Sequence, residues 1–173
     1  MLQKKLRNQA GFTLIEMLIV VILLGILAML IVPQISVSTE DAKLSQIQAN
    51  LSAMRNAVEL YYYEHKNTYP GENDVGGTAT TVALDAQTAF LAQLTQYTDE
   101  DGNVLEKKDA THIYGPYLKS ITLATNPYNN FNTVVCDFTD DITKREVDAG
   151  DFGWKFYPPN GVLMPNDADH KDM

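Results

Sequence analysis

The stretch GFTLIEMLIVVILLGILAMLIV, from Gly11 to Val32, decides how the rest of this sequence is interpreted. From Phe12 onward it contains 21 residues, of which only Thr13 and Glu16 are polar. At 1.5 Å per residue, a helix of this length is about 32 Å long, close to the thickness of a bilayer's hydrocarbon core. The stretch therefore predicts a helix over residues 12–32 that can span a membrane.

The residues on either side of this stretch indicate its orientation in the membrane and whether it is cleaved off. Three of the first 11 residues are basic and none is acidic. By the positive-inside rule, residues 1–11 lie in the cytoplasm and everything after Val32 lies on the other side of the membrane. A secretory signal peptide would have a small-residue cleavage site after the apolar run, but Pro33-Gln34-Ile35 follows it. The apolar run is therefore expected to stay on the protein.

Glu16 is the one carboxylate inside this run. A charge there costs about 2.5–3.5 kcal/mol on insertion scales, so the carboxylate needs a partner. Near the interface, a lipid headgroup or water would suffice. Alternatively, a cut after Gly11 would free the amine of Phe12, which is mostly protonated at neutral pH. In an assembly, Glu16 of one subunit could then neutralise the amine of its neighbour.

The order Gly11-Phe12-Thr13-Leu14-Ile15-Glu16, followed by the apolar helix and Pro33, resembles the class III signal of type IV pilins and type II secretion pseudopilins. The resemblance implies that residues 1–11 are a leader peptide, and that a prepilin peptidase cuts between Gly11 and Phe12 and methylates the new amine. It also implies that Glu16 guides subunit docking and that Pro33 marks a place where the helix bends or melts. A proline inside a helix removes one hydrogen bond, which gives that last role a physical basis.

The function implied by this resemblance is structural, and no catalytic constellation in the sequence suggests an enzyme. The precursor is expected in the bacterial inner membrane as a single-pass protein with a periplasmic head, and later in a periplasmic or surface filament. The implied partners are further copies of the chain, the prepilin peptidase, the inner-membrane assembly platform and minor pilins. One alternative is a minor pilin that binds a target at a filament tip, and another is a periplasmic enzyme anchored by a pilin-like N-terminus. The sequence does not settle whether the filament is a pilus or a secretion pseudopilus.

Beyond Pro33 the apolar residues thin to a stripe with spacings of three and four, which indicates one face of a helix. The stripe consists of Leu44, Ile47, Leu51, Met54, Val58 and Tyr61. Residues 33–66 are therefore predicted to continue the helix in amphipathic form. The sequence Asn67-Thr68-Tyr69-Pro70-Gly71 is expected to end it, because proline disfavours helix at the preceding residue and Pro-Gly marks a turn.

Residues 67–173 are predicted to form a globular α+β head. A second helix is expected over Val82–Gln96, and turn residues separate the candidate strands Ser120–Ala124, Thr133–Phe138, Phe152–Tyr157 and Val162–Met164. The Asn160-Gly161 pair favours a tight hairpin between the last two strands. The predicted fold is one long N-terminal helix packed on a small antiparallel sheet, which agrees with the pilin resemblance.

Charge and cysteine content limit the remaining possibilities. After the first 11 residues, the chain has 10 basic side chains against 22 acidic ones, which makes nucleic acid an unlikely partner. The single cysteine, Cys136, forms no intrachain disulfide and is assigned no role. The acidic residues near the C-terminus could bind Ca²⁺, with Asp167 and Asp169 the best candidate ligands, although acidic runs are usually solvated surface. No cofactor is required by this reading.

Overall fold

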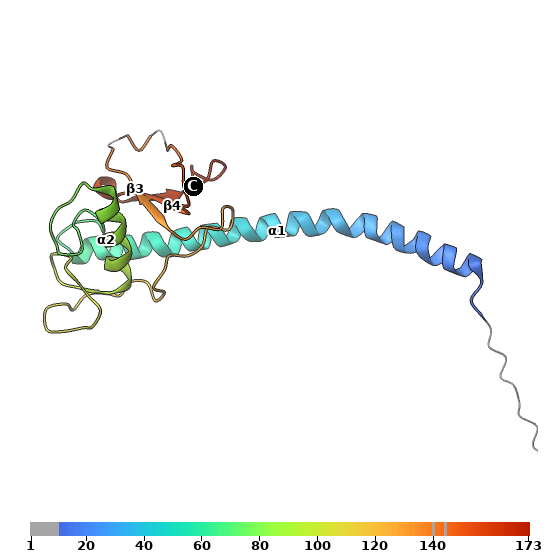
Figure 1. The fold of residues 1–173 in the computed structure, drawn as a ribbon, viewed down its shortest axis with the longest axis horizontal. Coiled ribbons are helices and arrows are strands. Elements are labelled where there is room, and N and C mark those ends of the chain that lie inside the picture. The colour runs from blue at the N-terminus through green and yellow to red at the C-terminus, as the bar shows by residue number, and fades with distance from the viewer. Residues whose placement is uncertain (1–10, 140, 144) are drawn as a thin grey trace, which may run out of the picture. The chain divides into compact units, whose positions relative to one another are not determined.

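The computed structural model describes residues 11–139, 141–143 and 145–173, and residues 30–38 through their backbone alone. The chain forms two compact units, residues 1–42 and residues 43–173 (Figure 1). Its elements are α1 (Leu14–Glu64), α2 (Ala83–Thr95), β1 (Tyr97–Thr98), β2 (Val104–Leu105), β3 (Val134–Cys136), β4 (Trp154–Tyr157), the 3₁₀ turn η1 (Pro158–Asn160) and β5 (Val162–Pro165). The predicted α+β class is confirmed.

Helix α1 confirms the predicted long helix. In the second unit it buries one face, on which five of the six predicted stripe residues are at most 2% exposed: Ile47, Leu51, Met54, Val58 and Tyr61. Leu44, at the start of the stripe, is 36% exposed. The helix ends at Glu64, and Lys66 and Asn67 follow with positive φ angles of 56° and 59°, so the chain turns where the sequence predicted.

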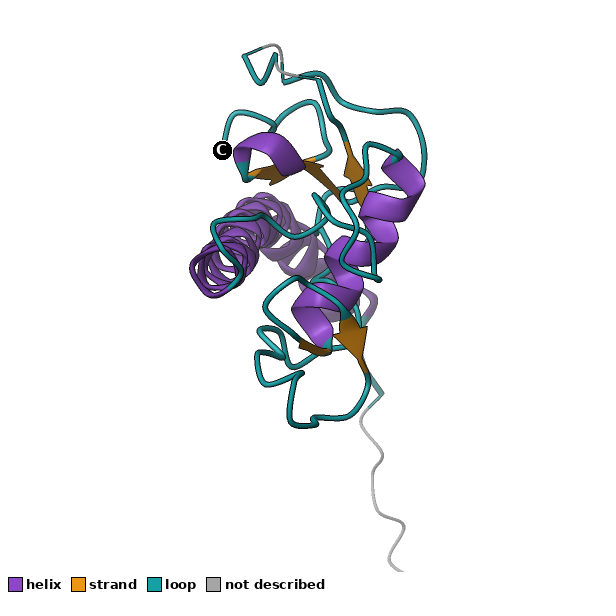
Figure 2. Cartoon of the chain, turned by 90° about the vertical axis from the view of Figure 1, so that its left-hand side faces the viewer, coloured by secondary structure: helices purple, strands orange, loops and turns teal. Residues whose placement is uncertain are grey.

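The core of the head forms where three elements meet. The stripe of α1 packs in one cluster with Phe90 and Leu94 of α2 and with Trp154 and Phe156 of β4. The rings of Phe90 and Phe156 lie 4.6 Å apart, and the indole nitrogen of Trp154 donates to the carbonyl oxygen of Ala124 at 2.7 Å. Figure 2 shows the strands and α2 beside the C-terminal part of α1.

The three-stranded sheet has the order β3-β4-β5 and is mixed. Strands β4 and β5 are antiparallel and are joined by η1 and Gly161, which confirms the predicted hairpin. Strands β3 and β4 are parallel, with Val134 opposite Trp154, so the predicted all-antiparallel sheet is wrong for this pair. The reason is the long connection over residues 137–153, because a parallel pair needs a crossover of about a dozen residues or more.

Two further differences concern short segments. The predicted strand Ser120–Ala124 is irregular, and it contributes to the core through Leu123, which is 4% exposed, rather than by strand pairing. A two-stranded antiparallel ribbon, β1 and β2, which the sequence did not predict, follows α2, and in it Thr98 pairs with Val104. Strands of two residues carry too little alternation for a sequence pattern to identify them.

Gly161 offers a test of the hairpin. Its φ is +67°, and a Cβ atom added there would lie 2.3 Å from the ring of Tyr69. We expect Gly161→Ala to lower the free energy of unfolding by about 1–3 kcal/mol, because a non-glycine residue is strained at such an angle. The measurement is denaturant unfolding of the full chain in mild detergent, followed by fluorescence of the buried Trp154. Gly76→Ala is the matched control, and equal losses in both variants would contradict this account.

His65 is a buried histidine at the end of α1 and is 1% exposed. Its Nδ1 atom lies 2.8 Å from the carbonyl oxygen of Tyr61, and its Nε2 atom lies 2.8 Å from Oγ1 of Thr98. A carbonyl only accepts, so Nδ1 carries the proton and Nε2 accepts from the threonine hydroxyl. Burial lowers the pKa of His65, and the opposing effects of the Tyr61 carbonyl and of the charges on Glu64 and Asp99 are smaller.

This lowered pKa predicts the sign of a pH effect on stability. Below about pH 6.5 the unfolded chain takes up a proton that the folded chain resists, so stability falls on acidification toward the folded-state pKa. Above that pH both states are neutral and the contribution is complete. We expect His65→Gln to flatten this part of the curve, as measured by unfolding titrations between about pH 5 and 8. An unchanged slope in the variant would show that other groups cause the effect.

Candidate functional site

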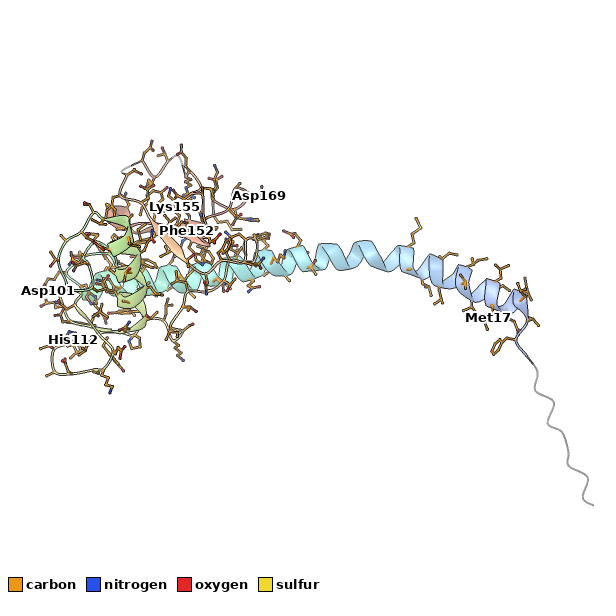
Figure 3. All side chains as sticks on the ribbon, in the orientation of Figure 1. Met17, Asp101, His112, Phe152, Lys155 and Asp169 are labelled. Atoms are coloured by element: carbon orange, nitrogen blue, oxygen red, sulfur yellow. The ribbon has the colours of Figure 1, made fainter. Side chains whose placement is uncertain are left out.

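The N-terminal unit exposes an unusually large apolar surface. Every described side chain from Gly11 to Met29 is exposed, and Phe12, Leu14 and Met29 are 80%, 86% and 81% exposed. Figure 3 shows these side chains projecting from the helix around Met17. A contiguous apolar surface of this kind marks a site that contacts another protein or a membrane. This segment is therefore the candidate functional site.

Some predictions for this segment concern residues that the structure does not describe. Among the described residues, no helical segment is both long and apolar enough to cross a bilayer. The predicted span over residues 12–32 includes residues 30–32, whose side chains lie outside the description. The predicted leader lies outside it as well, apart from Gly11. Pro33 lies within α1 by its backbone, and its role as a bending point stays a prediction.

Thr13 and Glu16 form a capping box at the start of α1. Oε2 of Glu16 accepts hydrogen bonds from the backbone nitrogen of Thr13 at 2.8 Å and from its hydroxyl at 2.7 Å. The backbone nitrogen of Glu16 in turn donates to the hydroxyl oxygen of Thr13 at 3.3 Å. Thr13 precedes the first helical residue, Leu14, so the two residues occupy the N-cap and N3 positions of the motif.

The capping box gives Glu16 a partner within its own chain, which the sequence analysis missed. The available signal was Thr-x-x-Glu directly before an apolar run, which is the sequence signature of this motif. All of the hydrogen bonds from Thr13 go to Oε2, and among the described residues none donates to Oε1. The carboxylate can therefore cap its own helix and still offer one oxygen to a partner outside the chain.

The capping box can be tested by changing Thr13. Thr13→Ala removes the hydroxyl that bonds Glu16 in both directions, and the loss of an N-cap side chain costs about 0.5–2 kcal/mol. We expect protection of the amides of residues 14–17 from hydrogen exchange to fall about 2- to 30-fold in detergent micelles. Thr13→Ser keeps the hydroxyl and should keep most of the protection. Equal loss in both variants would argue against the motif.

The two predicted calcium ligands, Asp167 and Asp169, have different surroundings. Asp167 is engaged through both oxygens: Oδ1 contacts the backbone nitrogen and Nδ1 of His170 at 3.0 and 2.6 Å, and Oδ2 accepts from Asn126 at 3.0 Å. Asp169 is exposed (Figure 3). Ca²⁺ takes six to eight oxygen ligands, and no three His, Cys, Asp or Glu side chains among the described residues are grouped to hold a metal. Calcium binding by Asp167 and Asp169 stays a prediction.

Cys136 lies in β3 and is 3% exposed. Burial raises its pKa to about 12, which keeps the thiol protonated. Nucleophilic and metal-binding chemistry needs the thiolate. Cys136 thus serves as a small apolar side chain in the core of the head.

Comparisons with known proteins agree on the N-terminal segment. A family profile described as "Prokaryotic N-terminal methylation motif" matches residues 6–32. The type II secretion system core protein G of Vibrio cholerae is 39% identical over 67 residues, which cover 39% of this chain and 45% of that protein. The protein of the same name from Pseudomonas aeruginosa is 44% identical over 55 residues, covering 32% of this chain and 39% of that protein.

A third relative extends into the head. The type IV major fimbrial protein FimA of Dichelobacter nodosus is 30% identical over 110 residues, which cover 56% of this chain and 69% of that protein. The chain spans less than half the length of the two core G proteins that it matches. No solved structure matches the chain.

Proposed function

This chain belongs to the type IV pilin-like family, which comprises type IV pilins and type II secretion pseudopilins, and from that membership we propose that it is a structural subunit of a filament. Proteins of this family are structural rather than enzymatic. In this proposal, the chain is made as an inner-membrane precursor, and its copies polymerise through helix α1. The relatives include both secretion and fimbrial proteins, so the proposal covers either kind of filament.

The observation that carries this proposal is the exposed apolar surface from Phe12 to Met29. Removing apolar surface from water is worth about 25 cal/mol per Å², so a helix with this surface is stable only when a bilayer or other helices cover it. A bilayer covers it in the precursor. In a filament, the same surface of neighbouring subunits covers it, and the polar, acidic head stays in water.

In this assembly, Glu16 would make a specific contact between neighbouring subunits. Cleavage after Gly11 would create the positively charged amine of Phe12, and the free Oε1 of Glu16 on a neighbour is suited to accept a hydrogen bond from it. Pairing the two removes both charges from an apolar environment at once. The assembly partners would be further copies of the chain, with the prepilin peptidase, the assembly platform and minor pilins acting on them.

Processing gives the first test of this proposal. When the chain is expressed with a prepilin peptidase, intact-mass analysis should show loss of residues 1–11 and the mass of one added methyl group. Without the peptidase, the chain should keep its full mass. Gly11→Glu should block the cut without unfolding the head, because a Cβ atom added at Gly11 would meet nothing within 4 Å. A cut after the apolar run would contradict the proposal.

Assembly gives the second test, and it separates the charge of Glu16 from its capping role. Glutamine also serves at the N3 position of a capping box, so Glu16→Gln keeps the helix start but cannot neutralise an amine. We expect filament yield to fall about tenfold or more, since an unpaired charge in apolar surroundings costs about 2.5–3.5 kcal/mol. The measurement is electron microscopy and quantification of sheared filaments. Glu59→Gln, at an exposed position of the same helix, is the matched control. Normal filaments from Glu16→Gln would refute the charge pairing.

A further inference from the structure

The segment over residues 137–153 connects the parallel strands β3 and β4, and its composition is unusual for that position. Such a crossover is commonly a helix that buries an apolar face against the sheet. Here the described residues of the segment form no helix and are irregular apart from a few turns and bends. The segment has six acidic side chains and two basic ones. Something other than a helical apolar face must therefore hold it in place.

Lys155 lies in the middle strand, β4, directly under this crossover. Its neighbours Trp154 and Phe156 enter the apolar core, so the alternation of a strand directs Lys155 to the opposite face. Its side chain is 3% exposed. The ammonium lies 2.9 Å from Oδ2 of Asp137 and 2.7 Å from Oδ2 of Asp148. It also donates to the backbone carbonyl oxygen of Glu146 at 3.0 Å, so all three oxygens belong to the crossover.

The backbones of Asp137 and Asp148 are held in position by contacts that do not involve Lys155. The backbone of Asp148 is bonded on both sides by Asn166, which accepts from its nitrogen at 2.9 Å and donates to its oxygen at 3.0 Å. Asn166 itself is 4% exposed. The backbone nitrogen of Asp137 donates to the carbonyl oxygen of Phe156 at 2.9 Å. Two partly exposed carboxylates and a carbonyl thus converge on the buried ammonium of Lys155, and we call these three oxygens the oxygen cradle.

We propose that the ammonium of Lys155 is a built-in structural cation that holds the acidic crossover on the sheet in the place of a divalent metal ion. Carboxylate and carbonyl oxygens are the ligands that a hard cation such as Ca²⁺ takes. With Lys155 in the cradle, the crossover is fixed by a covalently attached charge. The fold of the head then needs no metal ion at this position.

The protonation of Lys155 agrees with this role. Burial on its own would lower the pKa of the amine, but the interactions with the nearby carboxylates of Asp148 and Asp137 outweigh burial and raise the pKa above its ordinary value. The side chain also lies 5.1 Å from the ring of Tyr157, a favourable position for a cation. The charge is therefore present throughout the neutral range.

The test is to remove the internal cation and offer an external one. In the full chain in mild detergent, Lys155→Ala should lower the ratio of folded to unfolded protein about tenfold or more, because it removes the partner of two carboxylates whose side chains are 22% and 39% exposed. Calcium should restore much of this loss, raising the ratio about tenfold at a concentration ten times the dissociation constant. Potassium chloride at the same ionic strength should not. The double variant Lys155→Ala with Asp148→Asn should lose the response to calcium.

Two results would overturn the proposal. One is a folded Lys155→Ala variant whose unfolding midpoint responds to calcium no more than that of the unchanged chain. The other is an unchanged chain that calcium stabilises and chelator destabilises through an effect that Asp148→Asn abolishes, since a metal would then occupy the cradle already. If Lys155→Ala does not fold under any condition, Asp148→Asn alone decides: a loss of about tenfold in the folded ratio supports the proposal, and no loss overturns it.

Discussion

Helix α1 has more apolar surface than the rest of the chain covers, and the architecture follows from that excess. In the second unit, a stripe that includes Ile47 and Val58 is buried against α2 and β4, which is ordinary amphipathic packing. In the first unit, the described apolar side chains between Phe12 and Met29 are all exposed. One helix therefore has two kinds of surface, one satisfied within the chain and one that requires a bilayer or other subunits. This division is the physical basis for assigning folding to the head and assembly to the N-terminal unit.

The head compensates for its few regular strands with buried polar contacts. Gln93 is fully buried and accepts from the backbone of Gly71 while donating to that of Gly102, so it ties two loops to α2. Asn126, also fully buried, joins the oxygen of Gly153 to the carboxylate of Asp167. Lys155 joins strand β4 to Asp137 and Asp148 of the acidic crossover. Burying any of these polar side chains without its partners would cost free energy. Together they therefore favour one loop arrangement over others.

Sequence reasoning identified what periodicity and turn chemistry determine. The stripe of α1, the end of the helix before Pro70, α2 and the final hairpin all follow from local patterns that the structure confirms. The parallel pairing of β3 with β4 could not be predicted, because it depends on where a long irregular connection returns, and no local pattern encodes that. The position of Lys155 was likewise hidden, since a lysine between Trp154 and Phe156 looks like an ordinary outward-facing strand residue. The capping box was detectable from Thr13 and Glu16 alone, because Thr-x-x-Glu before an apolar run is the sequence signature of this motif.

In the proposed filament, the capping box would favour pairing of the Phe12 amine with a Glu16 carboxylate between subunits rather than within one. A cut after Gly11 places the new amine of Phe12 one residue before the N-cap, at the positive end of the helix dipole, where a cation is disfavoured. Glu16 of the same chain already compensates that end of the helix through Oε2. Its second oxygen is available to the amine of another subunit. Such a contact requires the start of one helix to lie level with the first turn of the next, so a single charge pair would fix the axial register between neighbouring subunits.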